Sequence, residues 1–198
     1  MRGSGWTRDG GWARRWRHVL RLLAGCLWVG GVLAGSIEPK SAALGPDERG
    51  QALNAEFAID LGPRLEDAVA RGVPLNFRFE IEITRKRWYW ADEHVAGRVL
   101  RYRLSYHALT RQYRLTVGSL HQNYDSLADA LQVLGRIGHL HVIDRAELVP
   151  GEPYRVALRL SLDHDQLPKP LQIDALADSD WRVETKTLRW EFVPTAEK

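Results

Sequence analysis

Cysteine is almost absent from this chain of 198 residues. The single cysteine, Cys26, lies in an apolar segment close to the N-terminus, and no other thiol follows it. The remainder of the chain therefore forms no disulfide, and it has neither a thiolate metal site nor a cysteine nucleophile. A domain of roughly 150 residues has a core large enough to fold without disulfides.

Recognisable catalytic motifs are also missing. The sequence has no Gly-x-Ser-x-Gly motif and no glycine-rich phosphate loop, because Gly135 and Gly138 follow a predicted helix instead of opening one. Glu80 and Glu82 are two residues apart on a predicted strand, where a solvated face is commoner than an acid–base pair. We therefore expect no enzymatic activity and no cofactor.

The chain has little net charge once its first forty residues are set aside. The formal net charge is +3, but residues 1–40 carry +5 and the remainder carries −2. The high basicity therefore belongs to the N-terminal segment, and the overall charge gives no support for binding to nucleic acid.

The N-terminal segment combines arginines with a short apolar stretch. Six arginines precede or interrupt the run Leu22–Gly35, which is the layout of an export signal. We expect residues 1–36 to be a signal peptide, cut before Gly35 or Ile37, or a retained anchor, since Val19–Ile37 is nearly long enough to cross a bilayer. Lipidation of Cys26 is a third alternative. Each fate places the remainder in the periplasm, or on the inner membrane facing it.

The expected domain organisation follows from composition. Residues 37–51 contain prolines, glycines and mixed charge, which is typical of a linker. We expect a single β-rich domain over residues 52–194 and a short tail over residues 195–198.

Alternation of apolar and polar residues dominates that domain. In the clearest case five large apolar residues, from Leu75 to Ile83, alternate with polar residues, which places them on one face of a strand. The same pattern predicts strands at 53–61, 75–84, 100–107, 113–117, 156–162 and 181–192. The apolar set changes parity near Lys186, which a β-bulge would explain. Strands with one wet face favour antiparallel sheets.

Two helices are predicted between these strands, and a third is weaker. Pro63–Arg71 begins with proline and ends before Gly72, and Ser126–Ile137 opens with a Ser-x-x-Asp cap. The weaker helix covers Leu171–Ala177. The fold class is therefore mainly β, an antiparallel sandwich or curled sheet of about six strands with two or three short helices.

Three histidines are candidate metal ligands. His139 and His141 share one face if their segment is extended, and His164 lies between two aspartates. No further ligand can be placed beside them from the sequence, so we expect no metal site. A metal-dependent hydrolase that uses these three histidines is the least favoured alternative.

The most unusual stretch is an aromatic–basic block, Arg85-Lys86-Arg87-Trp88-Tyr89-Trp90, which ends the clearest strand. Cations beside aromatic rings are suited to gripping a partner or a lipid interface. The structural alternative is that the tryptophans fold back over a sheet edge with the arginines stacked on them. We predict a binding surface formed by Arg85, Arg87, Trp88, Tyr89 and Trp90.

A carrier of a lipid or another apolar ligand is the alternative to a binding module. It predicts a cavity between the sheet layers. The residues expected to line it are Phe77, Phe79, Tyr102, Tyr106 and Leu158.

Several landmarks together resemble a known family. They are Gly72-Val73-Pro74-Leu75, Trp88-Tyr89-Trp90, the strand from Arg101 to His107, the helix from Ser126 to Leu131, Ile143-Asp144, Pro150-Gly151-Glu152, Trp181 and Trp190-x-Phe192. In this order the chain resembles the proteobacterial exported proteins grouped as domain of unknown function 4390 (DUF4390), over roughly residues 50–194. The resemblance implies no activity and no catalytic residue.

The resemblance also suggests a partner. Members of that family tend to be encoded beside a membrane-bound sensor histidine kinase, which implies a role in envelope sensing. We therefore expect an exported, non-enzymatic binding or accessory module of the cell envelope, with such a kinase as a candidate partner, the membrane reached through the N-terminal segment, and no nucleic acid bound.

Overall fold

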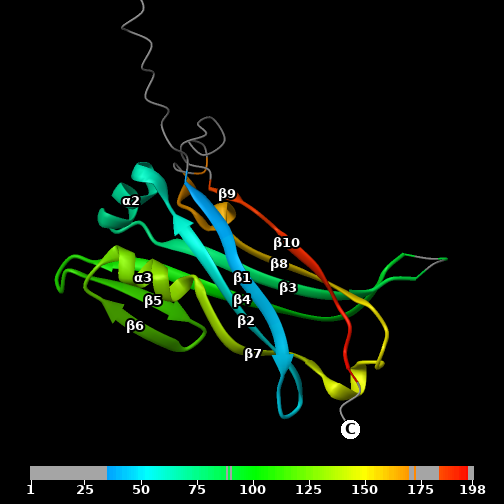
Figure 1. Ribbon diagram of the computed structural model, residues 1–198. Helices are drawn as coiled ribbons and strands as arrows, with labels where there is room; N and C mark the ends of the chain where they lie inside the picture. The colour runs from blue at the N-terminus through cyan, green and yellow to red at the C-terminus, as the bar shows by residue number, and fades with distance from the viewer. Residues whose placement is uncertain (1–34, 88, 90, 170–171, 173–182, 196–198) are drawn as a thin grey trace, which may run out of the picture. The chain divides into compact units, whose positions relative to one another are not determined.

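The described residues form two packed β-sheets with short helices at their ends (Figure 1). The computed structural model describes residues 35–87, 89, 91–169, 172 and 183–195. The elements are β1 (Ser36–Pro46), β2 (Gly50–Asp60), α2 (Gly62–Ala70), β3 (Leu75–Arg85), β4 (Glu93–His107), β5 (Gln112–Val117), β6 (Leu120–Tyr124), α3 (Leu127–Leu134), β7 (Arg136–Asp144), η1 (Arg145–Glu147), β8 (Tyr154–Leu162), η2 (His164–Gln166), β9 (Glu184–Thr185) and β10 (Leu188–Phe192).

The two sheets differ in size. The smaller sheet has the order β7-β2-β1-β9, in which the two-residue β9 pairs with β1 in parallel and the other pairings are antiparallel. The larger sheet is antiparallel throughout, with the order β10-β8-β3-β4-β5-β6. The predicted fold class, mainly β with antiparallel sheets in two layers, is confirmed.

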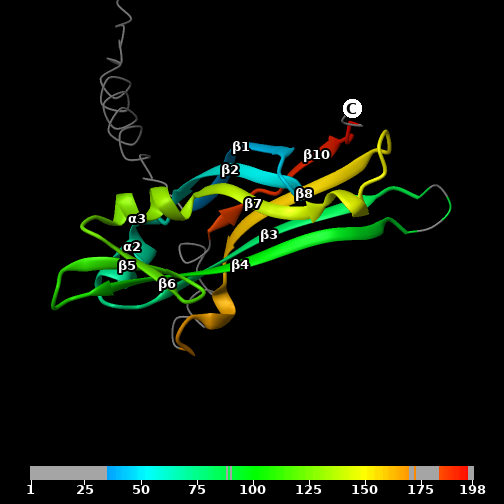
Figure 2. The same cartoon turned by 90° about the horizontal axis from the view of Figure 1, so that it is seen from below.

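The core lies between the two sheets. Alternate residues of β3 and β8 are fully or almost fully buried, as are Leu53 and Phe57 on β2. Phe57 of the smaller sheet meets Phe79 of the larger one edge to face, with ring centroids 6.3 Å apart. Figure 2 shows β1 and β2 of the smaller sheet on one side of β3 and β4 of the larger sheet. Apolar alternation thus buries one face of each sheet against the other.

The predicted helices are confirmed, with small changes at their ends. α2 buries Leu65 and Val69 and ends before Gly72, whose φ of +90° suits glycine. α3 opens on Ser126, whose side chain accepts a hydrogen bond from the Asp129 amide, and it ends at Leu134. Of the predicted helix Leu171–Ala177, only Gln172 lies within the described residues.

The predicted linker over residues 37–51 is wrong. Its residues form most of β1 and the start of β2, and Ile37 is fully buried. The prolines and glycines mark irregularities inside a hairpin: the pairing shifts register between Pro39 and Ser41, and Asp47 and Gly50 exchange backbone hydrogen bonds in the β1–β2 turn. The folded domain therefore begins near Ser36 instead of Ala52.

Two other expectations also need correction. The parity change near Lys186 is not a bulge within one strand, because β9 joins the smaller sheet and β10 joins the larger one. The residues after Gly135 leave the helix and form β7. Gly135 is required there, since a Cβ at this position would lie 2.5 Å from the carbonyl oxygen of Phe57.

Candidate functional site

The aromatic–basic block lies at the tip of the β3–β4 hairpin. β3 ends at Arg85 and β4 begins at Glu93, and these two residues face each other in the register. The hairpin extends beyond its neighbouring strands in Figures 1 and 2, so the connecting loop projects from the sheet. Trp88 and Trp90 lie outside the described residues, and the prediction for them stays a prediction.

One carboxylate organises the base of this loop. Glu93 Oε2 accepts hydrogen bonds from Arg85 Nε, at 3.0 Å, and from Arg85 Nη2, and it lies 2.7 Å from Arg87 Nη2. The hydrogen bonds from Arg85 and then Arg87 lower the pKa of Glu93, and the same carboxylate raises the pKa of Arg85. All three side chains are about one-third exposed. The two arginines are therefore held at the base of the loop.

A second ion pair ties the loop to the neighbouring strand. Asp92 Oδ2 accepts a hydrogen bond from Arg155 Nη1 at 2.8 Å, which joins the end of the loop to β8. Tyr89, by contrast, is 64% exposed. The tip of the loop thus exposes the Tyr89 side chain, while ion pairs hold the base of the loop on its β3 side and on its β4 side. Composition alone identified the aromatic–basic block. The ion pairs of Asp92 and Glu93 could not be predicted from the sequence, because they depend on the register of the strands.

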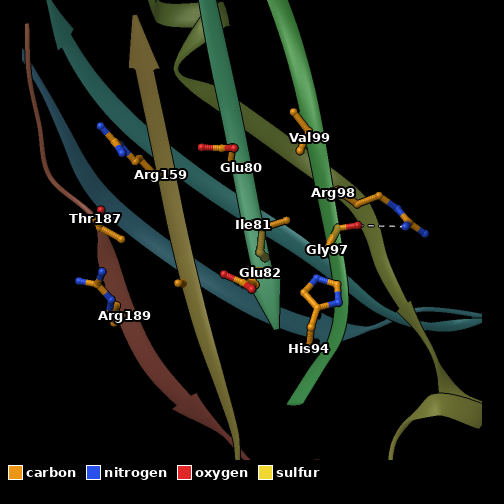
Figure 3. A pocket seen from close by; sticks show the side chains of 11 residues that line it. Glu80, Ile81, Glu82, His94, Gly97, Arg98, Val99, Arg159, Thr187 and Arg189 are labelled. Atoms are coloured by element: carbon orange, nitrogen blue, oxygen red, sulfur yellow. Dashed lines mark hydrogen bonds between the residues drawn. The ribbon is translucent and has the colours of Figure 1, made fainter. Parts of the chain in front are cut away.

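A charged depression of about 490 Å³ lies on the outer face of the larger sheet. Figure 3 shows Glu80 and Glu82 from β3 with Arg159 from β8, and Arg189 and His94 from the flanking strands. These side chains come from four strands, and acidic and basic groups are mixed among them. The sequence analysis predicted that Glu80 and Glu82 lie on a solvated face of a strand. Arg189 lies near them because β10 pairs with β8, and no local sequence pattern indicates that pairing.

The three histidines proposed as candidate metal ligands do not come together. His139 and His141 both contact Asp47: His139 Nε2 lies 3.3 Å from Oδ1, and His141 Nδ1 lies 3.0 Å from Oδ2. The other ring nitrogen of His141 lies 3.0 Å from Asp144 Oδ1. The contact with His141 is the main cause that lowers the pKa of Asp47. This cluster joins the β1–β2 turn to β7.

His164 lies elsewhere, in η2 after β8 of the larger sheet. Within the part of the chain that the structure describes, no three histidine, aspartate, glutamate or cysteine side chains are arranged to hold a metal ion.

The residues predicted to line a ligand cavity are core residues. Phe77, Phe79 and Leu158 are at most 1% exposed, and Tyr102 is 9% exposed. Tyr106 is partly buried and packs on Tyr113, with ring centroids 4.9 Å apart. None of these five residues lines the depression of Figure 3.

The sequence landmarks occupy defined places in this fold, from β3 through α3 to β10, and the family model of domain of unknown function DUF4390 matches residues 34–191. The chain belongs to the DUF4390 family. The predicted resemblance is thereby confirmed, and the match begins before β1, in agreement with the corrected start of the domain. No curated protein and no solved structure matches this DUF4390 protein.

The membrane-related predictions concern residues that the structure does not describe. Residues 1–34, which contain almost all of the predicted leader, lie outside the described residues. In the described part of the chain, no helix is long and apolar enough to span a bilayer.

Proposed function

We propose that this protein is a non-enzymatic binding module of the bacterial cell envelope, exported to the periplasmic side of the inner membrane, and that it contacts its partner through the tip of the β3–β4 hairpin. The observation that carries the proposal is the projecting loop, which exposes Tyr89 above the Arg85–Glu93–Arg87 cluster.

The geometry of the tip supports a contact surface. Binding requires that interface side chains and loops become ordered, and a loop whose two limbs are already fixed reduces this cost. Here Glu93 holds Arg85 and Arg87 on the β3 side of the loop, and the adjacent Asp92 ties the β4 side to Arg155 of β8. Tyrosine, tryptophan and arginine are also the residue types that contribute most to protein interfaces. Residues 85–90 contain all three types.

The proposed location and partner rest on the sequence and on family membership, and not on the geometry of the hairpin tip. The arginine-rich, apolar segment over residues 1–36 has the layout of an export signal or anchor. Membership of DUF4390 favours a membrane-bound envelope protein as the partner, with a sensor histidine kinase as the candidate.

Site-specific photocrosslinking in cells tests the proposal. A photoreactive amino acid replaces Tyr89 in the full chain, and the matched control replaces Leu109, which is fully exposed in the turn between β4 and β5. We expect an adduct with a membrane-embedded histidine kinase from position 89 and none from position 109. Equal adducts from both positions, or none from position 89, would contradict the proposal.

Alanine substitutions separate binding from folding. We expect Trp88→Ala with Trp90→Ala to abolish the position-89 adduct while the thermal unfolding midpoint stays close to that of the parent protein. Loss of the cooperative unfolding transition would instead identify the tryptophans as core residues and would remove the proposal.

A further inference from the structure

The outer face of the larger sheet carries several arginine side chains, whereas its inner face packs against the smaller sheet and forms the core. On β3, Arg78 lies between Phe77 and Phe79, which are buried. On β4, Arg101 and Arg103 are exposed and flank the buried Tyr102. Since successive side chains of a strand point to opposite faces, these arginines share the face opposite the core.

The register gathers these arginines into one group. Arg78 lies directly opposite Arg101, and Arg103 is the next residue on the same face of β4. Arg159 of β8 lies opposite Glu80, the next outward residue of β3 after Arg78. Directly opposed side chains have Cβ atoms about 4.5–5.5 Å apart, and like charges at that distance destabilise the sheet. We call Arg78, Arg101, Arg103 and Arg159 the arginine face.

The arginine face has unused hydrogen-bonding capacity. Arg101 has another arginine opposite it, while Arg103 has Asn76 and Thr116 as its neighbours. Among the described residues, neither arginine makes a side-chain hydrogen bond or an ion pair. Arg78 Nη2 contacts Glu80 Oε1 at 2.6 Å, but its Nε is buried without a partner. That buried atom is closed to a partner, whereas the guanidinium donors of Arg101 and Arg103 are exposed and can reach an acceptor on one.

We propose that the arginine face binds an acidic polypeptide segment of a partner protein. Arginine presents a planar fork that matches a carboxylate with two parallel hydrogen bonds, which lysine does not provide. Arg101 and Arg103 are two residues apart on a strand, a separation of about 6.5–7 Å. Carboxylates on alternate residues of an extended acidic segment repeat at the same distance, so two of them reach both arginines.

The neighbouring acids favour a polypeptide over a membrane surface. Glu80, which contacts Arg78, and Glu82 lie on the same face. An anionic bilayer presents negative charge over its whole surface and would repel both glutamates. A polypeptide places discrete carboxylates on the arginines and leaves the glutamates uncovered. This surface is separate from the hairpin tip, so the proposal does not depend on the proposed function.

The test measures binding of a fluorescein-labelled deca-glutamate peptide to the full chain, purified in detergent, by fluorescence anisotropy. We expect saturable binding that weakens as salt is added. Arg101→Glu with Arg103→Glu should weaken binding by about 100-fold, or about tenfold for each arginine–carboxylate pair that the substitutions remove. Arg101→Gln with Arg103→Gln should weaken it less, since no repulsion is added.

The control is a charge reversal of equal size away from the arginine face. Arg111 is exposed in the turn between β4 and β5, and Arg49 is exposed in the β1–β2 turn. Arg49→Glu with Arg111→Glu should leave binding within about threefold of the parent, because these positions lie outside the proposed contact.

Three results would overturn the proposal. The first is the absence of peptide binding to the parent protein, and the second is an equal loss of binding in the control variant. The third comes from a parallel binding assay with phosphatidylglycerol vesicles, if Arg101→Glu with Arg103→Glu weakens binding to the vesicles and leaves peptide binding intact. The last result would assign the surface to lipid. Circular dichroism of each variant establishes that the fold is retained, which we expect because the changed side chains are exposed.

Discussion

The contact between Phe57 and Phe79 gives the sharpest test of the two-layer fold. Phe57 is 5% exposed and Phe79 is fully buried, and their rings meet at an interplanar angle of 82°. An edge-to-face pair contributes about 0.5–1.5 kcal/mol beyond the area that it buries. Phe→Ala would cost about 3–5 kcal/mol at each position, a large share of the roughly 5–15 kcal/mol that stabilises a typical domain. Phe→Leu keeps most of the volume and is the better probe.

A double-mutant cycle measures this contact. We expect Phe57→Leu and Phe79→Leu to destabilise the protein separately, and the double variant to cost about 0.5–1.5 kcal/mol less than the sum of the two, because the ring–ring interaction can be removed only once. The measurement is urea unfolding of the full chain in constant detergent, followed by tryptophan fluorescence.

The same cycle with Phe192 provides the control. Phe192 lies at the end of β10, opposite Tyr154 in β8, whereas Phe79 lies opposite Leu160. The Phe79–Phe192 cycle should therefore be additive within about 0.3–0.5 kcal/mol. A coupling below about 0.3 kcal/mol for Phe57 and Phe79 would refute the packing of the two sheets through this pair.

Three further predictions concern single side chains. Arg101→Gln should raise the free energy of unfolding by about 0.2–1 kcal/mol in urea unfolding, because it removes the like charge opposite Arg78. Ser126→Ala should lower it by about 1 kcal/mol, since the Asp129 amide loses its cap. The hydrogen bonds from Arg85 and Arg87 lower the pKa of Glu93 in the folded state, so its contribution to stability is complete above the ordinary value of 4.5 and is lost as the pH falls through the lower folded value. The urea midpoint of Glu93→Gln should therefore fall less between pH 5 and pH 2.5 than that of the exposed control Glu147→Gln.

The parts of the fold that the sequence predicted share one property. Strands β2, β3, β4, β5, β8 and β10 each have one apolar face, and alternation finds them because the core covers only one side of each sheet. β6 escaped notice because four of its five residues are exposed, so it has no apolar face. β7 escaped notice because His139 has a positive φ and the pairing with β2 shifts register twice, which breaks the alternation.

The candidate sites show a similar division. The aromatic–basic block is contiguous in the chain, so composition alone identified it. The clamp from Glu93 to Arg85 and Arg87 depends on which residues face each other across the hairpin, and the group of Arg78 and Arg101 depends on the register of β3 with β4. Register is fixed by the packing of the whole sheet, so no local pattern reveals it.

The hairpin tip and three of the four arginines of the arginine face lie on β3 and β4, and this limits how partners can use the two surfaces. Arg78 and Arg85 are seven residues apart on β3, a distance of about 23 Å for an extended strand. A standard interface buries about 800 Å² on each partner, which corresponds to a disc roughly 30 Å across. One partner can therefore cover both surfaces only if its acidic segment lies about 23 Å from the region that contacts Tyr89. If one partner uses both, substitutions at Arg101 and Arg103 weaken the crosslink at position 89 as well as peptide binding. If the partners differ, these substitutions leave that crosslink unchanged.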